Sequence, residues 1–281
     1  MMQSDSDSET ENNALCQNYK GEGVQAADTV EWRDATRIVL LGWRWPGKSL
    51  AGNTILGREM FCSERASEFC VMRQAKVAER QVKVVDTPGW YSEQVTPKHF
   101  KQEIVHSVSL CSPGPHAFLL VVPVGLFTKS DLIKVEEHIN LLSDRAWKNM
   151  IVLFTWGNIL KDRTIEQHIQ REGKELQWLV EKCGNRYHVL NIESITELPQ
   201  VMKLLEKIDT MVEREGLYHS DIDEKELHDM KDEGWIPNIV VPEEESDDFK
   251  KQVMTRKEIE SLDLPLKSTG ERPCQRNADQ P

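Results

Sequence analysis

The feature that most constrains this chain is an apolar segment that runs directly into a glycine-rich loop. The segment Arg37–Leu41 is followed by residues 42–49, which match the pattern G-x-x-x-x-G-K-[ST], and by the helix-like stretch Ser49–Gly57. Such a loop wraps a polyphosphate with backbone N–H groups, places a lysine on the phosphate oxygens and offers a hydroxyl to Mg²⁺. We therefore expect a triphosphate site made by Gly42, Trp43, Arg44, Trp45, Gly47, Lys48, Ser49 and Leu50.

A second apolar segment ends in a motif that is also typical of nucleotide-binding proteins. Val82–Val85 is followed by Asp86-Thr87-Pro88-Gly89. In P-loop GTPases such an aspartate holds Mg²⁺ through a water, and the glycine N–H senses the γ-phosphate, so that the following loop orders with GTP. We expect Asp86 near the metal and Gly89 near the phosphates.

The charge of the chain divides it into three parts. The net charge of −12 splits into −6 for residues 1–35, +2 for residues 36–216 and −8 for residues 217–281. We expect a globular domain over 36–216 between an acidic, disordered N-terminal tail over 1–35 and an acidic, largely disordered extension over 217–281. Acidic tails repel nucleic acid, so we expect no nucleic-acid partner.

The cysteines and the apolar runs indicate the compartment of the protein and whether it has a membrane span. Its six cysteines contain no C-x-x-C pair and no histidine at metal-ligand spacing, so they are expected to be reduced thiols in the cytoplasm. The longest apolar run, Ala117–Val122, is much shorter than the 18 or so residues of a membrane span. We therefore expect no transmembrane segment.

Strand-like and helix-like segments alternate across residues 36–216. Continuous apolar strands need cover on both faces, which a parallel sheet between helices provides. The expected strands are Arg37–Leu41, Val82–Val85, Ala117–Val122, Met150–Phe154 and Tyr187–Leu190, with Phe69–Val77 as an antiparallel edge strand. The segments with helical apolar spacing are 100–108, 132–142, 165–179 and 198–212. The pattern predicts a doubly wound α/β fold with its ligand at the carboxyl ends of the strands.

The order of the motifs resembles the GTPases of immunity-associated proteins (IMAP) family. The resemblance rests on the two motifs above together with Val122–Asp131, Val152–Gly157 and Cys183–His188, and it covers roughly residues 36–216. It implies a Ras-like sheet with extra helices, binding of GTP or GDP with Mg²⁺, self-association that depends on nucleotide, and a role in immune-type cells. Homo- or hetero-oligomers with related GTPases are the implied partners.

The same resemblance extends the expected site. Ser67 falls where the family has the threonine that closes over Mg²⁺, which adds it to Ser49 and Asp86 as a metal-site residue. Asn191 falls where the family places an asparagine beside the base. The segment Thr155-Trp156-Gly157-Asn158 matches the base-reading motif T-x-x-D, except that the final aspartate is an asparagine.

That asparagine weakens the expected selectivity for guanine. An aspartate accepts hydrogen bonds from both N1–H and the exocyclic amine, whereas the Asn158 amide offers one acceptor and one donor. Stacking of Trp156 on the base would offset part of the loss, since base–aromatic stacking contributes roughly 1 to 3 kcal/mol. The alternative is that Trp156 packs against the loop after its strand.

The phosphate-binding motifs carry further departures. Pro46 has no N–H to donate to a phosphate, and Arg44 either acts near the γ-phosphate or points to solvent, which we take as the default. Trp90 follows Gly89 where many GTPases have the glutamine that orients the attacking water. We expect Trp90 to be exposed as an anchor for self-association; the alternative is that it packs the loop after Gly89. We also expect slow intrinsic hydrolysis, with no residue firmly assigned as catalytic.

Two functions from different classes follow. In the first, the protein is a guanine-nucleotide-binding switch or scaffold that hydrolyses GTP slowly; intact Lys48, Ser49 and Asp86 favour it. In the second, it is a pseudo-GTPase that binds nucleotide weakly or not at all and acts as an interaction module; Asn158 and Pro46 favour that alternative.

Overall fold

The computed structural model describes residues 35–219, except Trp45, Pro46, Glu64, Glu93, Ser194 and Thr196. Of the expected tails over 1–35 and 217–281, all but residue 35 and residues 217–219 therefore lie outside the described residues. The strands are β1 (Thr36–Gly42), β2 (Val71–Val77), β3 (Arg80–Asp86), β4 (Ala117–Pro123), β5 (Met150–Thr155) and β6 (Tyr187–Leu190). The α-helices are α2 (Gly47–Leu56), α3 (Lys98–Ser109), α4 (Lys129–Ile139), α5 (Ile165–Glu172), α6 (Lys174–Lys182) and α7 (Leu198–Glu215), with 3₁₀ turns η1 (Asn140–Leu142), η2 (Asp144–Asn149) and η3 (Gly157–Leu160).

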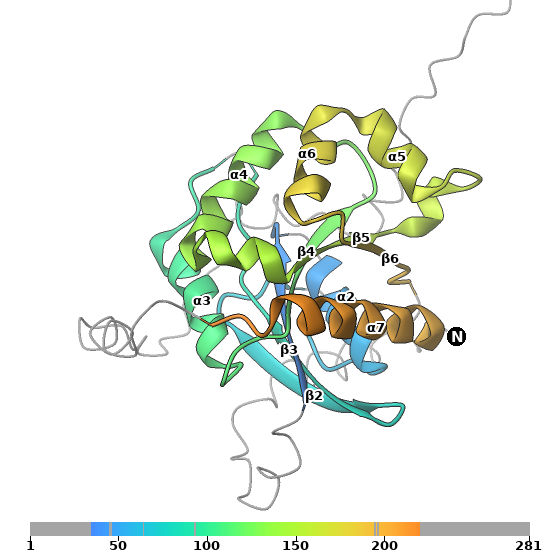
Figure 1. Ribbon diagram of the computed structural model, residues 1–281. Coiled ribbons are helices and arrows are strands. Elements are labelled where there is room, and N and C mark those ends of the chain that lie inside the picture. Colours follow the sequence, from blue (N-terminus) through green and yellow to red (C-terminus); the bar gives the residue numbers. More distant parts are fainter. Residues whose placement is uncertain are drawn as a thin grey trace, which may run out of the picture.

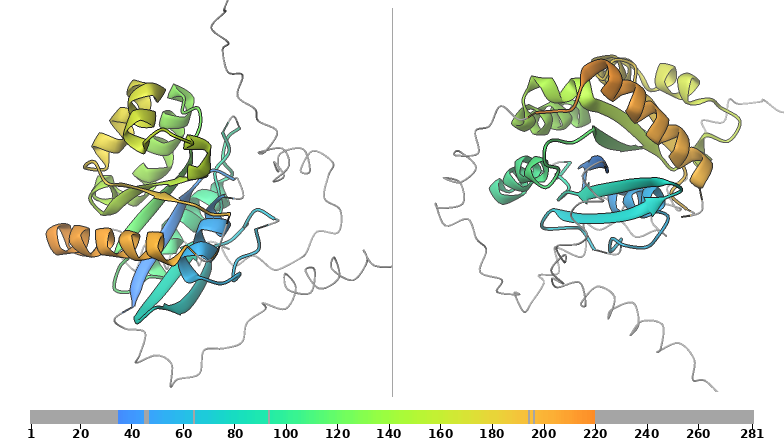
Figure 2. Two further views of the ribbon diagram at one scale, coloured as in Figure 1. Left: turned by 90° about the vertical axis from the view of Figure 1, so that its right-hand side faces the viewer. Right: turned by 60° about the horizontal axis from the view of Figure 1, so that its bottom comes forward.

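The six strands form one sheet in the order β2-β3-β1-β4-β5-β6, with helices on both of its faces (Figure 1). Every neighbouring pair is parallel except β2 with β3, which form a long antiparallel hairpin at one edge (Figure 2). This confirms the doubly wound α/β fold and the antiparallel edge strand. Because β1 is parallel to its neighbours β3 and β4, the loops after these three strands lie at one edge of the sheet. The order of the strands reverses at β1, with β3 on one side and β4 on the other, and ligands of such sheets bind at this point.

Alternate residues of each central strand supply the two cores. In β1, Val39 and Leu41 face the cluster that packs under α3 to α6, whereas Ile38 and Leu40 face the cluster under α2 and α7. This two-sided burial is why the strands read as continuous apolar runs. The stripe predicted over 198–212 is α7, whose buried side chains include Leu204, Leu205 and Ile208.

Two segments differ from the sequence-based expectation. The stretch 165–179 forms two helices instead of one, because Gly173 between α5 and α6 has φ of 112°, which no helix accommodates. Tyr218 lies two residues beyond the expected domain boundary, yet it is buried against Phe118 with ring centroids 5.0 Å apart. The folded part of the chain thus extends past residue 216.

The loop between β3 and α3 is attached to helix α4 through Trp90. The Trp90 ring is fully buried and stacks on the His138 imidazole, with centroids 4.7 Å apart and planes 18° apart. It also packs against Trp43, 5.5 Å away. The expectation of an exposed Trp90 was wrong: α4 crosses the loop and covers the ring, a contact between segments nearly fifty residues apart in sequence.

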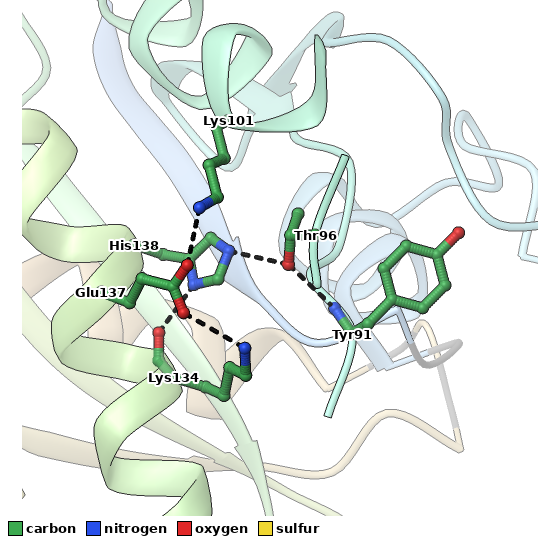
Figure 3. Close-up of polar contacts among 6 residues, drawn as sticks. All are labelled: Tyr91, Thr96, Lys101, Lys134, Glu137 and His138. Atoms are coloured by element: carbon green, nitrogen blue, oxygen red, sulfur yellow. Dashed lines mark hydrogen bonds and ion pairs between the residues drawn. The ribbon is translucent and has the colours of Figure 1, made fainter. Parts of the chain in front are cut away.

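Hydrogen bonds from His138 complete this attachment (Figure 3). Its Nδ1 lies 2.7 Å from the Lys134 carbonyl oxygen, which can only accept, so Nδ1 carries the proton. Nε2 then accepts from the Thr96 hydroxyl at 2.9 Å, and the Thr96 oxygen accepts weakly from the Tyr91 N–H at 3.4 Å. The Thr96 hydroxyl can donate to Nε2 only when the imidazole is neutral.

The groups around His138 leave it neutral. Burial lowers the pKa of His138, although the Lys134 carbonyl and Glu137 oppose the shift; Lys101 and Lys134 add to it. The hydrogen bonds from these two lysines hold the pKa of Glu137 at about 2, so its charge persists at any moderate pH. The ammonium groups of Lys101 and Lys134 lie 2.6 Å and 3.2 Å from the Glu137 carboxylate.

We predict that acid weakens the fold partly through His138. A histidine whose pKa is lower in the folded than in the unfolded chain stabilises the fold above the unfolded value of about 6.5, and this contribution is lost as the pH falls toward the folded value. The pKa values of His116 and His188, held near 4 by burial, act in the same direction. In urea titrations at pH 7.5 and 5.5, His138→Phe should lose less stability between the two pH values than wild type.

The matched control is His99→Phe, which changes an exposed histidine at the start of α3. Its loss of stability between the two pH values should equal that of wild type. If His138→Phe also follows wild type, His138 does not contribute to the pH dependence.

Candidate functional site

The phosphate loop begins where β1 ends, at Gly42, and leads into the first turn of α2. The ammonium group of Lys48 donates to the Trp43 carbonyl oxygen at 2.7 Å, so the lysine side chain reaches back across the loop. Burial lowers the pKa of Lys48, and the charge of Asp86 opposes that shift. Trp45 and Pro46 lie outside the described residues. Leu50, in the first turn of α2, is half-buried.

The three expected metal-site residues meet at one point. The Ser49 hydroxyl donates to Asp86 Oδ2 at 2.7 Å, and the Ser67 hydroxyl donates to the same oxygen at 3.0 Å. Ser67 comes from the loop before β2, so three separate segments converge here. Burial raises the pKa of Asp86, against the charge of Lys48 and the two hydroxyl hydrogen bonds.

These side chains fit a magnesium ion by their chemistry. The other carboxylate oxygen, Asp86 Oδ1, is buried and accepts no hydrogen bond from any residue that the structure describes. One carboxylate and two hydroxyls are the hard oxygen ligands that Mg²⁺ prefers, and Mg²⁺ commonly binds with one carboxylate and keeps several waters. A cluster of three or more histidine, cysteine or acidic side chains does not occur within the described part of the chain.

Gly89 is attached to the phosphate loop by main-chain contacts. Trp43 and Trp90 form a parallel β-bridge, the Arg44 N–H donates to the Trp90 carbonyl at 2.9 Å, and the Trp90 N–H donates to the Gly42 carbonyl at 3.2 Å. A side chain at Gly89 would lie 2.4 Å from the backbone of Arg44. Only glycine fits this approach, and the phosphate loop and the loop after β3 are therefore neighbours through their backbones.

Arg44 does not follow the default of pointing to solvent. Its side chain is buried, with the guanidinium carbon 5.4 Å from the centre of the Tyr91 ring and 5.3 Å from that of Phe100. Both distances are typical of cation–π contacts. The correction arises because the loop after β3 and helix α3 supply two aromatic faces beside the phosphate loop, a neighbourhood that no local pattern encodes.

The end of β5 lies beside the phosphate loop, and the turn that follows it packs on β6. The Thr155 hydroxyl, at the end of β5, is 3.6 Å from where a Cβ would stand on Gly47. This hydroxyl is buried and has no hydrogen-bond partner among the described residues. A Cβ on Gly157 would meet the Val189 side chain at 2.5 Å, so η3 packs directly on β6.

Asn158 and Asn191 are both brought to this edge, but their amides make contacts within the protein. Asn158 Nδ2 donates to the Glu193 carboxylate at 2.8 Å. Asn191 Oδ1 accepts from the Glu193 N–H at 3.2 Å, and the Asn191 N–H donates to the Gln200 side chain at 2.8 Å. Sequence reasoning missed Glu193; its position two residues after Asn191, at the end of β6, was the available signal.

Trp156 is only 5% exposed and belongs to the core cluster under α2 and α7. This burial corresponds to the packing alternative for Trp156 and leaves little of its ring available for stacking on a base. Among the described helices, none combines the length and hydropathy of a membrane-spanning segment.

Comparison with known proteins assigns the chain to a protein family. Residues 36–234 match the AIG1 family. Human GTPase IMAP family member 8 is 32% identical over 195 residues, which are 67% of this chain and 28% of that protein. The chain thus spans less than a third of the length of that relative.

Solved structures of similar fold come from the chloroplast translocon. Toc33 from Arabidopsis thaliana in complex with Mg²⁺ and GMPPNP has a TM-score of 0.53 and 13% identity, over 66% of this chain and 88% of that chain. A structure described as "Dimerization is important for the GTPase activity of chloroplast translocon components atToc33 and psToc159" has a TM-score of 0.51 and 12% identity, over 64% and 84%. At these identities the likeness shows a shared P-loop GTPase fold. Because the family match covers most of the chain and includes both phosphate-binding motifs, the protein belongs to the AIG1 family.

Proposed function

We propose that this protein is a guanine-nucleotide-binding switch or scaffold that uses Mg²⁺. The observation that carries the proposal is the meeting of Ser49, Ser67 and Asp86, with Lys48 on the same loop. A structure of similar fold holds Mg²⁺ with a GTP analogue, and a relative is named a GTPase, which supports the same assignment.

Each group in the site has a defined task. Gly42, Gly47 and the described amides of the phosphate loop and of α2 approach the phosphates, and Lys48 contributes positive charge to them. Ser49, Ser67 and Asp86 hold the metal, which when bound neutralises phosphate charge. Thr155, Asn158 and Asn191 lie at the base side of the site. Gly89 lies where a backbone N–H can respond to the γ-phosphate.

We propose that intrinsic GTP hydrolysis is slow. Trp90 stands where many GTPases have a glutamine, and its buried indole has no acceptor or base with which to hold and deprotonate the attacking water. Arg44 is engaged between Tyr91 and Phe100, so it reaches a phosphate only if these contacts break. Rapid turnover therefore needs a group from outside the domain.

Self-association provides such a group in our proposal. Two apolar side chains near the phosphate edge are strongly exposed: Val95, at 81%, in the loop after β3, and Leu126, at 74%, after β4. They replace Trp90 as the expected interface anchors. The dimerization described for the chloroplast GTPases of similar fold supports an interface that depends on the nucleotide. A cytoplasmic setting in immune-type cells, with related GTPases as partners, belongs to the same proposal.

We predict that Lys48→Ala loses GTP affinity by about tenfold or more, because charge-assisted hydrogen bonds to phosphate contribute about 1.5 to 3 kcal/mol. Titration of a fluorescent GTP analogue into the full chain measures this. The control is Lys76→Ala, which removes a largely exposed lysine on edge strand β2 and should bind as wild type. Absence of binding by wild type itself would instead support the pseudo-GTPase alternative.

We predict that a non-hydrolysable GTP analogue shifts the chain toward dimers relative to GDP. Nucleotide can shift the equilibrium only if dimer and monomer differ in affinity, and a hundredfold difference corresponds to about 2.7 kcal/mol of coupling. Sedimentation of the full chain with GDP, with the analogue and without nucleotide measures the shift.

The paired variants for sedimentation are Val95→Asp, expected to reduce the dimer fraction, and Ile133→Asp, at an exposed position of α4, as the control. Equal mass distributions in the three nucleotide states would leave the protein a monomeric binder.

A further inference from the structure

At the base side of the site, Asn158 alone does not offer enough hydrogen-bond acceptors to recognise guanine. The guanine edge that P-loop GTPases read carries two donors, N1–H and the exocyclic amine, and therefore needs two acceptors. A single asparagine supplies one acceptor and one donor, so Asn158 alone would place its NH₂ group against a guanine donor. A protein of this kind needs a second acceptor beside Asn158.

The structure supplies a carboxylate at that place. Asn158 Nδ2 lies 2.8 Å from Glu193 Oε1. Because a carboxylate only accepts, this bond fixes the orientation of the Asn158 amide and engages its donor. Two acceptors remain available from the pair: Asn158 Oδ1 and the carboxylate of Glu193.

We propose that Asn158 and Glu193 together read the guanine base. Asn158 Oδ1 accepts from N1–H of the guanine edge, and the Glu193 carboxylate accepts from the exocyclic amine. Glu193 is thus a specificity-determining residue, and the aspartate missing from the T-x-x-D motif is replaced by a carboxylate from the next loop. The inference rests on the proposed binding of guanine nucleotide and assigns the residue that selects the base.

The position of Glu193 is set by its surroundings. Its N–H donates to Asn191 Oδ1, and the Asn191 N–H is held in turn by Gln200 of α7. Residues 154 and 155 of β5 pair with residues 189 and 190 of β6, so the loops carrying Asn158 and Glu193 start side by side. Both side chains are exposed, as groups that meet a ligand must be.

The same pair discriminates against adenine. The corresponding edge of adenine presents the N1 lone pair and a C–H group in place of two donors. Asn158 Oδ1 facing that lone pair is repelled, and the Glu193 carboxylate meets a C–H group, so neither acceptor of the pair gains a hydrogen bond. Selectivity for GTP over ATP should therefore depend on Glu193 as well as on Asn158.

The test compares GTP, ATP and inosine triphosphate, which lacks the exocyclic amine, by competition against a fluorescent GTP analogue on the full chain. Glu193→Gln should bind GTP about tenfold or more weakly, the change expected for loss of one charge-assisted acceptor, with ATP affinity unchanged. It should also lose part of the preference for GTP over inosine triphosphate. The control is Glu213→Gln, which makes the same charge change at an exposed site of α7 and should match wild type.

An exchange of the two groups sharpens the test. Asn158→Asp sets two carboxylates against each other and should not tighten GTP, whereas the double variant Asn158→Asp with Glu193→Gln restores one amide and one carboxylate and should bind within about threefold of wild type. Such rescue is not expected if Glu193 serves only to support the loop.

The outcomes separate this inference from the proposed function. If wild type binds GTP and Glu193→Gln binds it equally well, or if Asn158→Asp alone tightens GTP tenfold, Glu193 does not read the base, while nucleotide binding stands. If wild type binds none of the three nucleotides, the proposed function fails and the assignment of Glu193 fails with it.

Discussion

The parallel pairing of β1 with β3 is the constraint on which the rest of the site depends. Its register sets Leu40 opposite Asp86, so the aspartate stands at the point where β1 gives way to the phosphate loop. The Thr87 hydroxyl reinforces the pairing by donating to the Leu40 carbonyl at 2.7 Å. A shift of this register would move Asp86 away from Ser49 and turn its side chain to the other face of the sheet. The meeting of Ser49 and Asp86 is therefore a consequence of sheet pairing.

The same pairing continues beyond the strands and connects the phosphate loop to the neighbouring loop. The backbone bonds of Trp90 to Gly42 and Arg44 make the loop after β3 sensitive to any movement of the phosphate loop. Trp90 then extends the connection to α4 through His138. Packed contacts therefore run without a break from the phosphate loop through Trp90 to α4.

Near Asn158, the loop after β6 supplies a carboxylate that the loop after β5 lacks. An asparagine in place of an aspartate reads as a loss when the T-x-x-D segment is taken alone. Glu193, some thirty-five residues later, returns a carboxylate to the same place because β5 and β6 are neighbours in the sheet. Substitutions in recognition motifs of this fold are best judged with the loop after the next strand in view.

The sequence by itself determined the fold class, the phosphate loop and the strands that bear the motifs, because these depend on local signals: continuous apolar runs, a glycine-rich loop and helix-period stripes. It also named Ser49, Ser67 and Asp86, which the structure brings together. Tertiary structure alone decided the burial of Trp90 by α4, the position of Arg44 between Tyr91 and Phe100, and the partner of Asn158. Each of these depends on segments that are distant in sequence and adjacent only once the sheet has formed, and side-chain burial is a property of that packing, not of the local pattern.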